Sequence, residues 1–183
     1  MSWGGENVTF SRDTEVIEIP SGFKFTVEAG THALITQSLG GSHTLVTSEG
    51  QMVRVSSLDA DAIGKEVVGG GDIKPPENKD DVEKLVWDEL RTVFDPEIPV
   101  NIADLGLIYN CKVSPHPDGD YQVNIEMSLT APGCGMGDVL KMEVEDKVER
   151  LPRVQDCEVE MVFDPPWDPS MMPEATKLQL GML

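Results

Sequence analysis

The stretch of sequence that decides the fold is YQVNIEMSLTAPGCGMGDVLKMEVEDKVERL, residues 121–151. Apolar and polar side chains alternate over its first nine residues, which is typical of a strand with one buried face. The Gly-rich segment Pro132–Gly137 then interrupts the pattern. After it, apolar residues recur at helical spacing, at Val139, Leu140, Val144, Val148 and Leu151. The stretch therefore predicts a strand, a tight loop and an amphipathic helix.

Further elements flank this unit on both sides. Asn78 is expected to cap a helix that ends at Asp95-Pro96. Alternating patterns predict two more strands, at residues 107–113 and 157–163. A short helix from Ser170 completes the order helix, strand, strand, helix, strand, helix. Because a helix joins the last two strands, they should run parallel with a right-handed crossover. We expect a small mixed sheet with helices on one face.

The sequence ahead of this region has a different character. Residues 69–71 are three glycines, which predict a flexible joint. The pair Pro75-Pro76 then predicts a stiffer segment. Before the joint, short strand patterns alternate with Gly-containing turns, including a hairpin signal at Gly40-Gly41. We therefore predict an α+β protein of two domains. Residues 1–73 would form a small all-β, barrel-like domain of unassigned role, and residues 74–183 the mixed domain.

Composition excludes several classes of function. The 183 residues include 14 Lys and Arg against 33 Asp and Glu, a formal net charge of −19. Without a basic face, we expect no nucleic-acid partner and no anionic membrane partner. We also expect no membrane span and no secretory signal. Three cysteines are too few for a disulfide framework, which fits a cytoplasmic protein in a reducing environment.

Cys134 is the strongest candidate for chemistry, because it lies between the predicted strand and the following helix. Backbone N–H groups and the helix dipole would stabilise a thiolate there, and the flanking glycines would admit a ligand. The alternative is a tight turn in which Cys134 packs as a small apolar group. Cys111 and Cys157 share strand faces with large apolar residues, so we expect buried hydrophobes. No CxxC or CxxH spacing occurs, which argues against a four-ligand metal site within one chain.

Carboxylates in the loop after the first helix form a second candidate group. Asp95 and Glu97 stand in a stiff, Pro-containing segment, and we expect both to be exposed. They could ligate a hard metal, accept hydrogen bonds or orient a thiol, but the pattern alone favours simple helix termination. Asp104, ahead of Leu105-Gly106, is typical of a turn. Thr130 would either donate a hydrogen bond to the thiolate or end its strand.

Four separated segments resemble one known family. They read DPEIPVNIADLGLIY at 95–109, LTAPGC at 129–134, VEMVFDPPW at 159–167 and KLQLGM at 177–182. Their order and spacing are similar to those of the domain shared by SufT, the phenylacetate-pathway protein PaaD and the eukaryotic cytosolic iron–sulfur targeting proteins. The resemblance covers about residues 78–183, and the long first half is similar to that of longer bacterial SufT proteins.

The resemblance implies a site as well as a fold. Cys134 would be the functional cysteine and the iron–sulfur ligand, and the same pocket would be lined by Asp95, Glu97, Asp104 and Thr130. The expected function is non-enzymatic: a SUF-type maturation factor that helps deliver a transiently held iron–sulfur cluster to apo-proteins. Its partners would be scaffold or carrier proteins, apo client proteins and, in a homo-oligomer, a second copy.

Two alternatives stay open. One is an adaptor that docks client proteins without binding iron. The other is a thiol-dependent enzyme with Cys134 as nucleophile or redox centre. The lack of a general-base histidine or a resolving cysteine near Cys134 argues against the enzyme.

Overall fold

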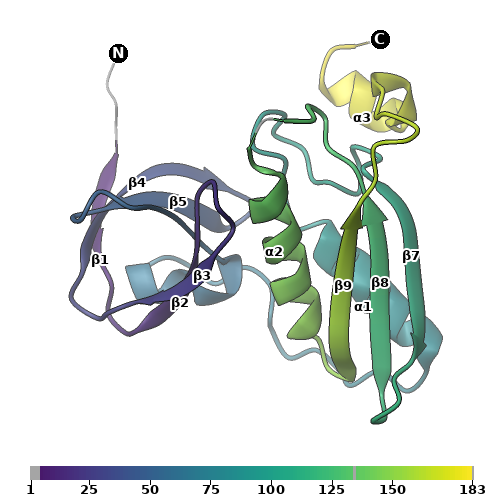
Figure 1. Ribbon diagram of the computed structural model, residues 1–183, viewed down its shortest axis with the longest axis horizontal. Helices are drawn as coiled ribbons and strands as arrows, with labels where there is room; N and C mark the ends of the chain where they lie inside the picture. Colours follow the sequence, from purple (N-terminus) through teal and green to yellow (C-terminus); the bar gives the residue numbers. More distant parts are fainter. Residues whose placement is uncertain (1–4, 134, 183) are drawn as a thin grey trace.

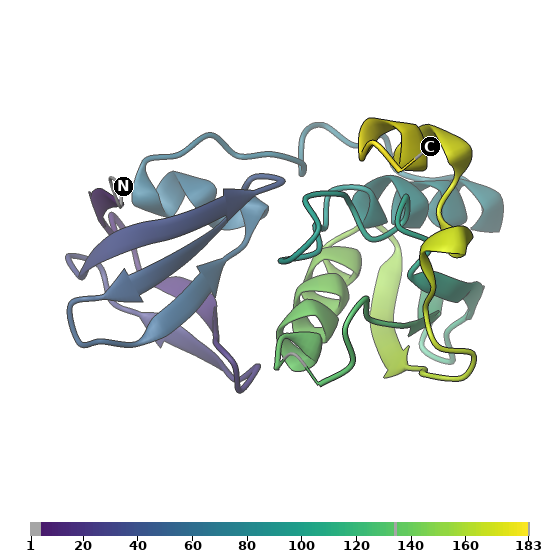
Figure 2. The same ribbon diagram turned by 90° about the horizontal axis from the view of Figure 1, so that it is seen from above.

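The computed structural model describes residues 5–133 and 135–182, which form two β-sheets with their helices. Figure 1 shows the first sheet beside helix α2 of the second part. Figure 2 shows the extended segment that crosses from one part to the other. The mixed α+β class expected from the sequence is confirmed. No helix of the described part is long and apolar enough to cross a membrane.

The first sheet is antiparallel, with the strand order β1-β4-β5-β6-β2-β3. Its elements are β1 (Glu6–Thr9), β2 (Thr14–Glu18), β3 (Lys24–Val27), β4 (His32–Leu39), β5 (Ser42–Thr47), β6 (Met52–Val55) and the 3-10 helix η1 (Ser57–Ile63). Leu45 and Val53 lie at the centre of its apolar core. β1 and β3 are the two ends of the order, and within the described ranges no pairing joins them. The sheet is therefore open rather than closed into a barrel.

The second sheet has the order β7-β8-β9 and is covered by helices on one face. Its elements are α1 (Lys79–Leu90), β7 (Ile108–Pro115), β8 (Tyr121–Met127), α2 (Gly137–Glu149), β9 (Val154–Met161), the 3-10 helix η2 (Pro169–Met171) and α3 (Glu174–Gln179). β7 is antiparallel to β8, and β9 returns parallel to β8 after α2. Ile125 and Val159 are paired in register and buried with Val86 of α1 and Val144 of α2.

Helix α1 begins where the sequence predicts but ends earlier. Asn78 caps it, because its Oδ1 accepts a hydrogen bond from the backbone N–H of Asp81 at 3.0 Å. The helix ends at Leu90 rather than at Asp95-Pro96. The hydroxyl of Thr92 donates to the carbonyl oxygen of Glu89 at 2.7 Å. This bond turns the chain out of the helix before the proline is reached.

The free edge of β9 is occupied by carboxylates of α2. The backbone N–H of Val159 donates to Oε1 of Glu145 at 3.0 Å. The carboxyl of Glu149 lies beside the backbone of Cys157 on the same edge, and burial raises the pKa of this carboxyl above its usual value. The amide of Val159, which a further strand would need, is thus already engaged by a side chain.

A buried ion cluster lies between the two parts. Arg54 of β6 and Glu143 of α2 are 2% and 1% exposed, and Nε lies 2.6 Å from Oε2. The N–H direction does not meet hydrogen-bond geometry, so this contact is an ion pair. The hydroxyl of Ser42 donates to Oε1 of Glu143 at 2.7 Å. Burial opposes ionisation of Glu143, but the charges of Arg54 and Lys147 outweigh it and hold the pKa of this carboxyl below its usual value.

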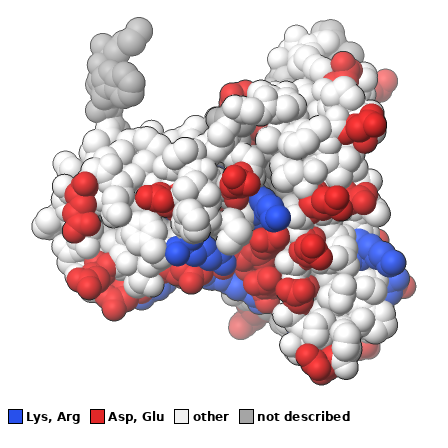
Figure 3. All heavy atoms as spheres, in the orientation of Figure 1, with Lys and Arg blue, Asp and Glu red and all other residues white. Residues whose placement is uncertain are grey.

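Ion pairs at the margin of the same contact are partly exposed. Nζ of Lys24 lies 3.0 Å from Oδ1 of Asp146, and Arg150 donates to Asp59 at 2.9 Å. On the face shown in Figure 3, acidic side chains outnumber basic ones over both parts. Basic groups paired across the contact therefore neutralise part of a strongly acidic surface where the parts meet.

Candidate functional site

Three loops meet at one end of the second sheet (Figure 1). β8 and β9 both end there, whereas the antiparallel β7 begins there. The loops are residues 91–107 ahead of β7 (the Asp95 loop), residues 128–136 between β8 and α2 (the Cys134 loop) and residues 162–173 after β9. The topology therefore brings segments far apart in sequence to one sheet end.

Asp95 is the centre of the hydrogen bonds in the Asp95 loop. Its Oδ1 accepts from the backbone N–H groups of Glu97 and Ile98, both at 2.9 Å. Its Oδ2 accepts from the hydroxyl of Thr130 at 3.2 Å. The side chain is only 2% exposed, so the expectation of an exposed carboxylate was wrong. The loop folds back so that two amides and one hydroxyl replace the water around this carboxylate.

Thr130 anchors the base of the Cys134 loop. A threonine hydroxyl carries one proton, and in this structure that proton is directed at Asp95. A hydrogen bond from Thr130 to a thiolate would need the same proton. The contact therefore joins the Cys134 loop to the Asp95 loop, rather than leaving Thr130 free to serve the sulfur.

The other two predicted carboxylates lie in the same loop but make different contacts. Glu97 is exposed, as expected. Asp104 is half-buried, and its Oδ2 accepts from Nδ2 of Asn101 at 2.8 Å. The backbone N–H of Asp104 donates to Oδ1 of Asn101 at the same distance. No hydrogen bond joins the side chain of either residue to Asp95 or Thr130 in the described part of the chain.

Cys134, the cysteine expected to carry the chemistry, lies outside the described residues. Its neighbours Gly133 and Gly135 are exposed and have φ of 89° and 77°. This backbone region favours glycine strongly over other residues. Helix α2 begins at Gly137, and among residues 5–133 and 135–182 no side chain caps its N-terminus. The N–H groups of its first turn are therefore not capped by any side chain that the structure describes.

The other two cysteines lie where the alternating patterns predict. Cys157 is 4% exposed within the core of the second sheet, and Cys111 is half-buried against it. Burial, with a smaller contribution from Glu83, raises the pKa of the Cys111 thiol to about 11. Burial also raises the pKa of the Cys157 thiol well above its ordinary value. The expectation of a buried, hydrophobic cysteine is confirmed for Cys157, whereas Cys111 is only half-buried.

The segment after β9 is hydrogen bonded to the Asp95 loop and to the start of β7. Nε1 of Trp167 donates to the carbonyl oxygen of Leu105 at 2.7 Å. The hydroxyl of Tyr109 donates to the carbonyl oxygen of Pro165 at 2.8 Å. Gly106 has a φ of 72°, and a β-carbon there would lie 2.6 Å from the carbonyl oxygen of Met171. These supporting residues were not singled out from the sequence, although most stand within the family-like segments.

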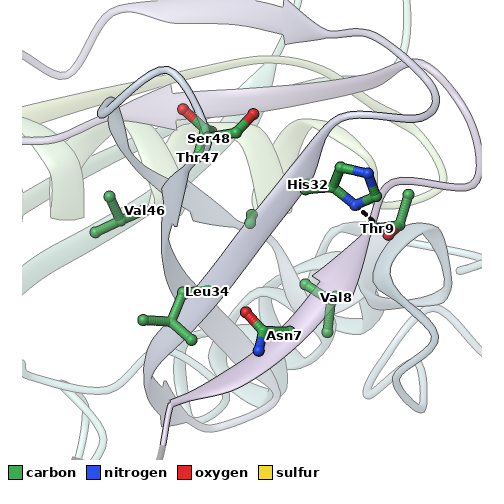
Figure 4. A pocket seen from close by; sticks show the side chains of 9 residues that line it. Asn7, Val8, Thr9, His32, Leu34, Val46, Thr47 and Ser48 are labelled. Atoms are coloured by element: carbon green, nitrogen blue, oxygen red, sulfur yellow. Dashed lines mark hydrogen bonds between the residues drawn. The ribbon is translucent and has the colours of Figure 1, made fainter.

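Metal-ligand geometry and cavities add little to this site. The described ranges hold no cluster of three His, Cys, Asp or Glu side chains suited to a metal ion. A hollow of about 450 Å³ lies on the first sheet, and His32 and Thr9, hydrogen bonded at 2.9 Å, line one side of it (Figure 4). Its described lining contains no cysteine and no carboxylate.

The fold and the three loops define a class of small α+β domain with one cysteine in a glycine-flanked loop ahead of a helix. The chain belongs to the family of iron–sulfur cluster assembly proteins within this class, and the family model matches residues 83–161.

Three relatives illustrate this membership. An Fe-S protein maturation auxiliary factor of Porphyromonas gingivalis is 46% identical over 94 residues, which cover 51% of this chain and 86% of that protein. The Fe-S protein maturation auxiliary factor SufT of Staphylococcus aureus is 37% identical, with 49% and 98% covered. The Fe-S protein maturation auxiliary factor YitW of Bacillus subtilis is 35% identical, with 55% and 95% covered. About half of this chain lies outside each match.

We predict that Asp95→Ala lowers the stability of the protein, because three hydrogen-bond donors lose their buried acceptor. Unsatisfied buried donors cost about 1–3 kcal/mol. Thermal melting of the purified variant measures the loss. Glu97→Ala is the matched control, since an exposed carboxylate in the same loop should change stability by less than about 0.5 kcal/mol. Equal melting temperatures for the two variants would show that the Asp95 contacts are not structural.

A second prediction concerns the order in which the thiols react. Near neutral pH, iodoacetamide should label Cys134 first, because the thiolate is the reactive form and burial raises the pKa of Cys111 to about 11. Labelling of Cys111 should accelerate as the pH rises toward that value. Mass-spectrometric mapping of native protein follows all three sites. Earlier labelling of Cys111 or Cys157 than of Cys134 contradicts the assignment.

Proposed function

We propose that this protein is an iron–sulfur maturation factor that accepts a cluster as cargo and passes it to apo-proteins through Cys134. Family membership and the names of the three relatives support this function. The observation that supports a role for this cysteine in cluster transfer is the conformation of the loop around it. Glycines at positive φ flank Cys134, and the start of α2, which no described side chain caps, follows directly.

One thiolate per chain suits transfer rather than storage. Proteins that keep iron–sulfur clusters commonly hold them with four cysteines. With one ligand from this chain, the remaining ligands come from a scaffold, a client or a second copy. The N–H groups at the start of α2 favour the anionic sulfur. Each iron–sulfur bond to Cys134 that breaks is replaced by a bond to a client thiolate, so the exchange needs no oxidant or reductant.

The carboxylates have different roles in this proposal. Asp95 holds the base of the Cys134 loop through Thr130. Glu97 is exposed in the neighbouring loop and Asp104 is half-buried there. In this proposal, both contact the protein that docks over Cys134. The partners are scaffold or carrier proteins and apo clients. The working place is a reducing cytoplasm, because a thiol that exchanges clusters must stay reduced.

We also propose that the chain divides into two domains, residues 1–73 and 74–183. The fully buried residues of each hydrophobic cluster lie on one side of this boundary, and residues 66–72 are all exposed. Ile73, the last residue of the first range, packs against the second cluster, so one partly buried apolar contact crosses this boundary.

The domain proposal predicts that residues 74–183 fold on their own. Every fully buried residue of their apolar core is retained, although the partly buried Ile73 is lost, and Glu143 and Lys147 gain water where they lose Arg54. Circular dichroism and thermal melting of the fragment should show native-like secondary structure and a cooperative transition. An unfolded fragment would mean that the two parts fold only as one unit.

Cluster binding is tested by anaerobic reconstitution followed by visible absorption. The wild-type protein and Cys111→Ser should acquire cluster bands, whereas Cys134→Ser should lose them and keep its melting temperature. Cys134→Ser should also fail to support a cluster-dependent client enzyme in a deletion strain. Client binding by a wild-type protein that never acquires cluster bands would replace the carrier with the adaptor. Thiol turnover without either property would indicate the enzyme.

A further inference from the structure

The first sheet contacts the Asp95 loop through the turn between β4 and β5. Gly40 stands in this turn with a φ of 60°, and it packs directly on Phe94. A β-carbon at Gly40 would clash with the Phe94 ring and would lie 2.7 Å from the carbonyl oxygen of Thr92. Nε2 of Gln37 also donates to the carbonyl oxygen of Pro96 at 3.4 Å. These contacts hold the backbone on both sides of Asp95.

A second turn of the same sheet contacts the Cys134 loop. Gly22, between β2 and β3, has a φ of 76°, and a β-carbon there would lie 2.9 Å from Cβ of Asp138 in the first turn of α2. A β-carbon at Gly135 would meet Cβ of Pro20 at 3.7 Å, an ordinary packing distance. The β2–β3 turn therefore lies against both the start of α2 and the residue that follows Cys134 in sequence.

The ion cluster connects these two contacts. Arg54 and Ser42 of the first sheet hold Glu143 in the middle of α2. One turn further along α2, Nζ of Lys147 donates to Oγ1 of Thr92 at 3.1 Å. Thr92 stands three residues ahead of Asp95. The first sheet thus contacts α2, the helix that follows the Cys134 loop. Through Lys147 of α2, it is also connected to the Asp95 loop.

We propose that the first sheet is a positioning module for the site, which fixes the Asp95 loop and the Cys134 loop relative to each other. Gly40, Gly22 and Arg54 are positioning residues, since they act through Phe94, Asp138 and Glu143. The inference rests on the proposed function of Cys134, and it gives the first half of the chain a role in that function.

Glycine variants of the full chain test this inference. Gly40→Ala and Gly22→Ala each insert a methyl group into one of the two contacts. Both should raise the rate at which iodoacetamide labels Cys134 several-fold. Both should also accelerate hydrogen exchange of backbone amides in residues 94–101 and 131–136, while the amides of β5 and β6 stay protected. Ser42→Ala removes a bond to Glu143 without adding bulk, and this milder variant should move the same measurements in the same direction.

Two further glycines of the same sheet provide matched controls. Gly50 and Gly30 have φ of 86° and 88°, and a β-carbon at either would meet no atom within 4 Å. Gly50→Ala and Gly30→Ala impose the same backbone strain on the sheet but touch neither loop, so both should label Cys134 at the wild-type rate. Wild-type labelling and exchange in Gly40→Ala and Gly22→Ala, or equal changes in the controls, would overturn the inference. Neither measurement involves a cluster, so failure of cluster binding would leave this result standing.

Discussion

The arrangement of the two sheets depends on the pairing of Arg54 with Glu143. Both side chains are almost completely removed from water, and neither charge is tolerable there without the other. Removing one partner of such a pair costs roughly 3–5 kcal/mol, because the remaining charge stays buried. Since Arg54 belongs to β6 and Glu143 to α2, the pair selects which face of α2 meets the first sheet. Once this face of α2 is fixed, the positions of the glycine turns at both margins, and their contacts with the two loops, are fixed as well.

Helix α2 packs against the second sheet through apolar residues and against the first sheet through charged residues. Only the apolar contact could be predicted from the sequence. Its apolar residues, such as Val144, repeat at helical spacing and pack on the second sheet as expected. Glu143 and Lys147 stand four residues apart, a spacing that normally marks an ion pair on a solvated face. Both are instead about 1% exposed. Their burial depends on Arg54, Ser42 and Thr92, which come from distant parts of the chain, so no local pattern could indicate it.

The same distinction separates what was predicted of the site from what was not. Periodicity predicted the strand and helix on either side of Cys134, and the family-like segments selected Asp95 and Thr130. Their hydrogen bond, and the burial of Asp95, are set by where a nonperiodic loop folds back on itself. The early end of α1 has a similar origin, because the hydroxyl of Thr92 competes with the helix for the Glu89 carbonyl. Loop residues were identified by type, but their contacts required the structure.

The carboxylates on the free edge of β9 have a consequence for strand pairing with other chains. An open strand edge presents unpaired backbone groups, and it is a template on which other chains can assemble. On β9, Glu145 engages the amide of Val159 and Glu149 lies beside the backbone of Cys157. An incoming strand would have to displace the half-buried Glu145 and the exposed Glu149 before it could pair. The edge is therefore protected against pairing with a strand of another polypeptide, and it does not offer a seed for aggregation.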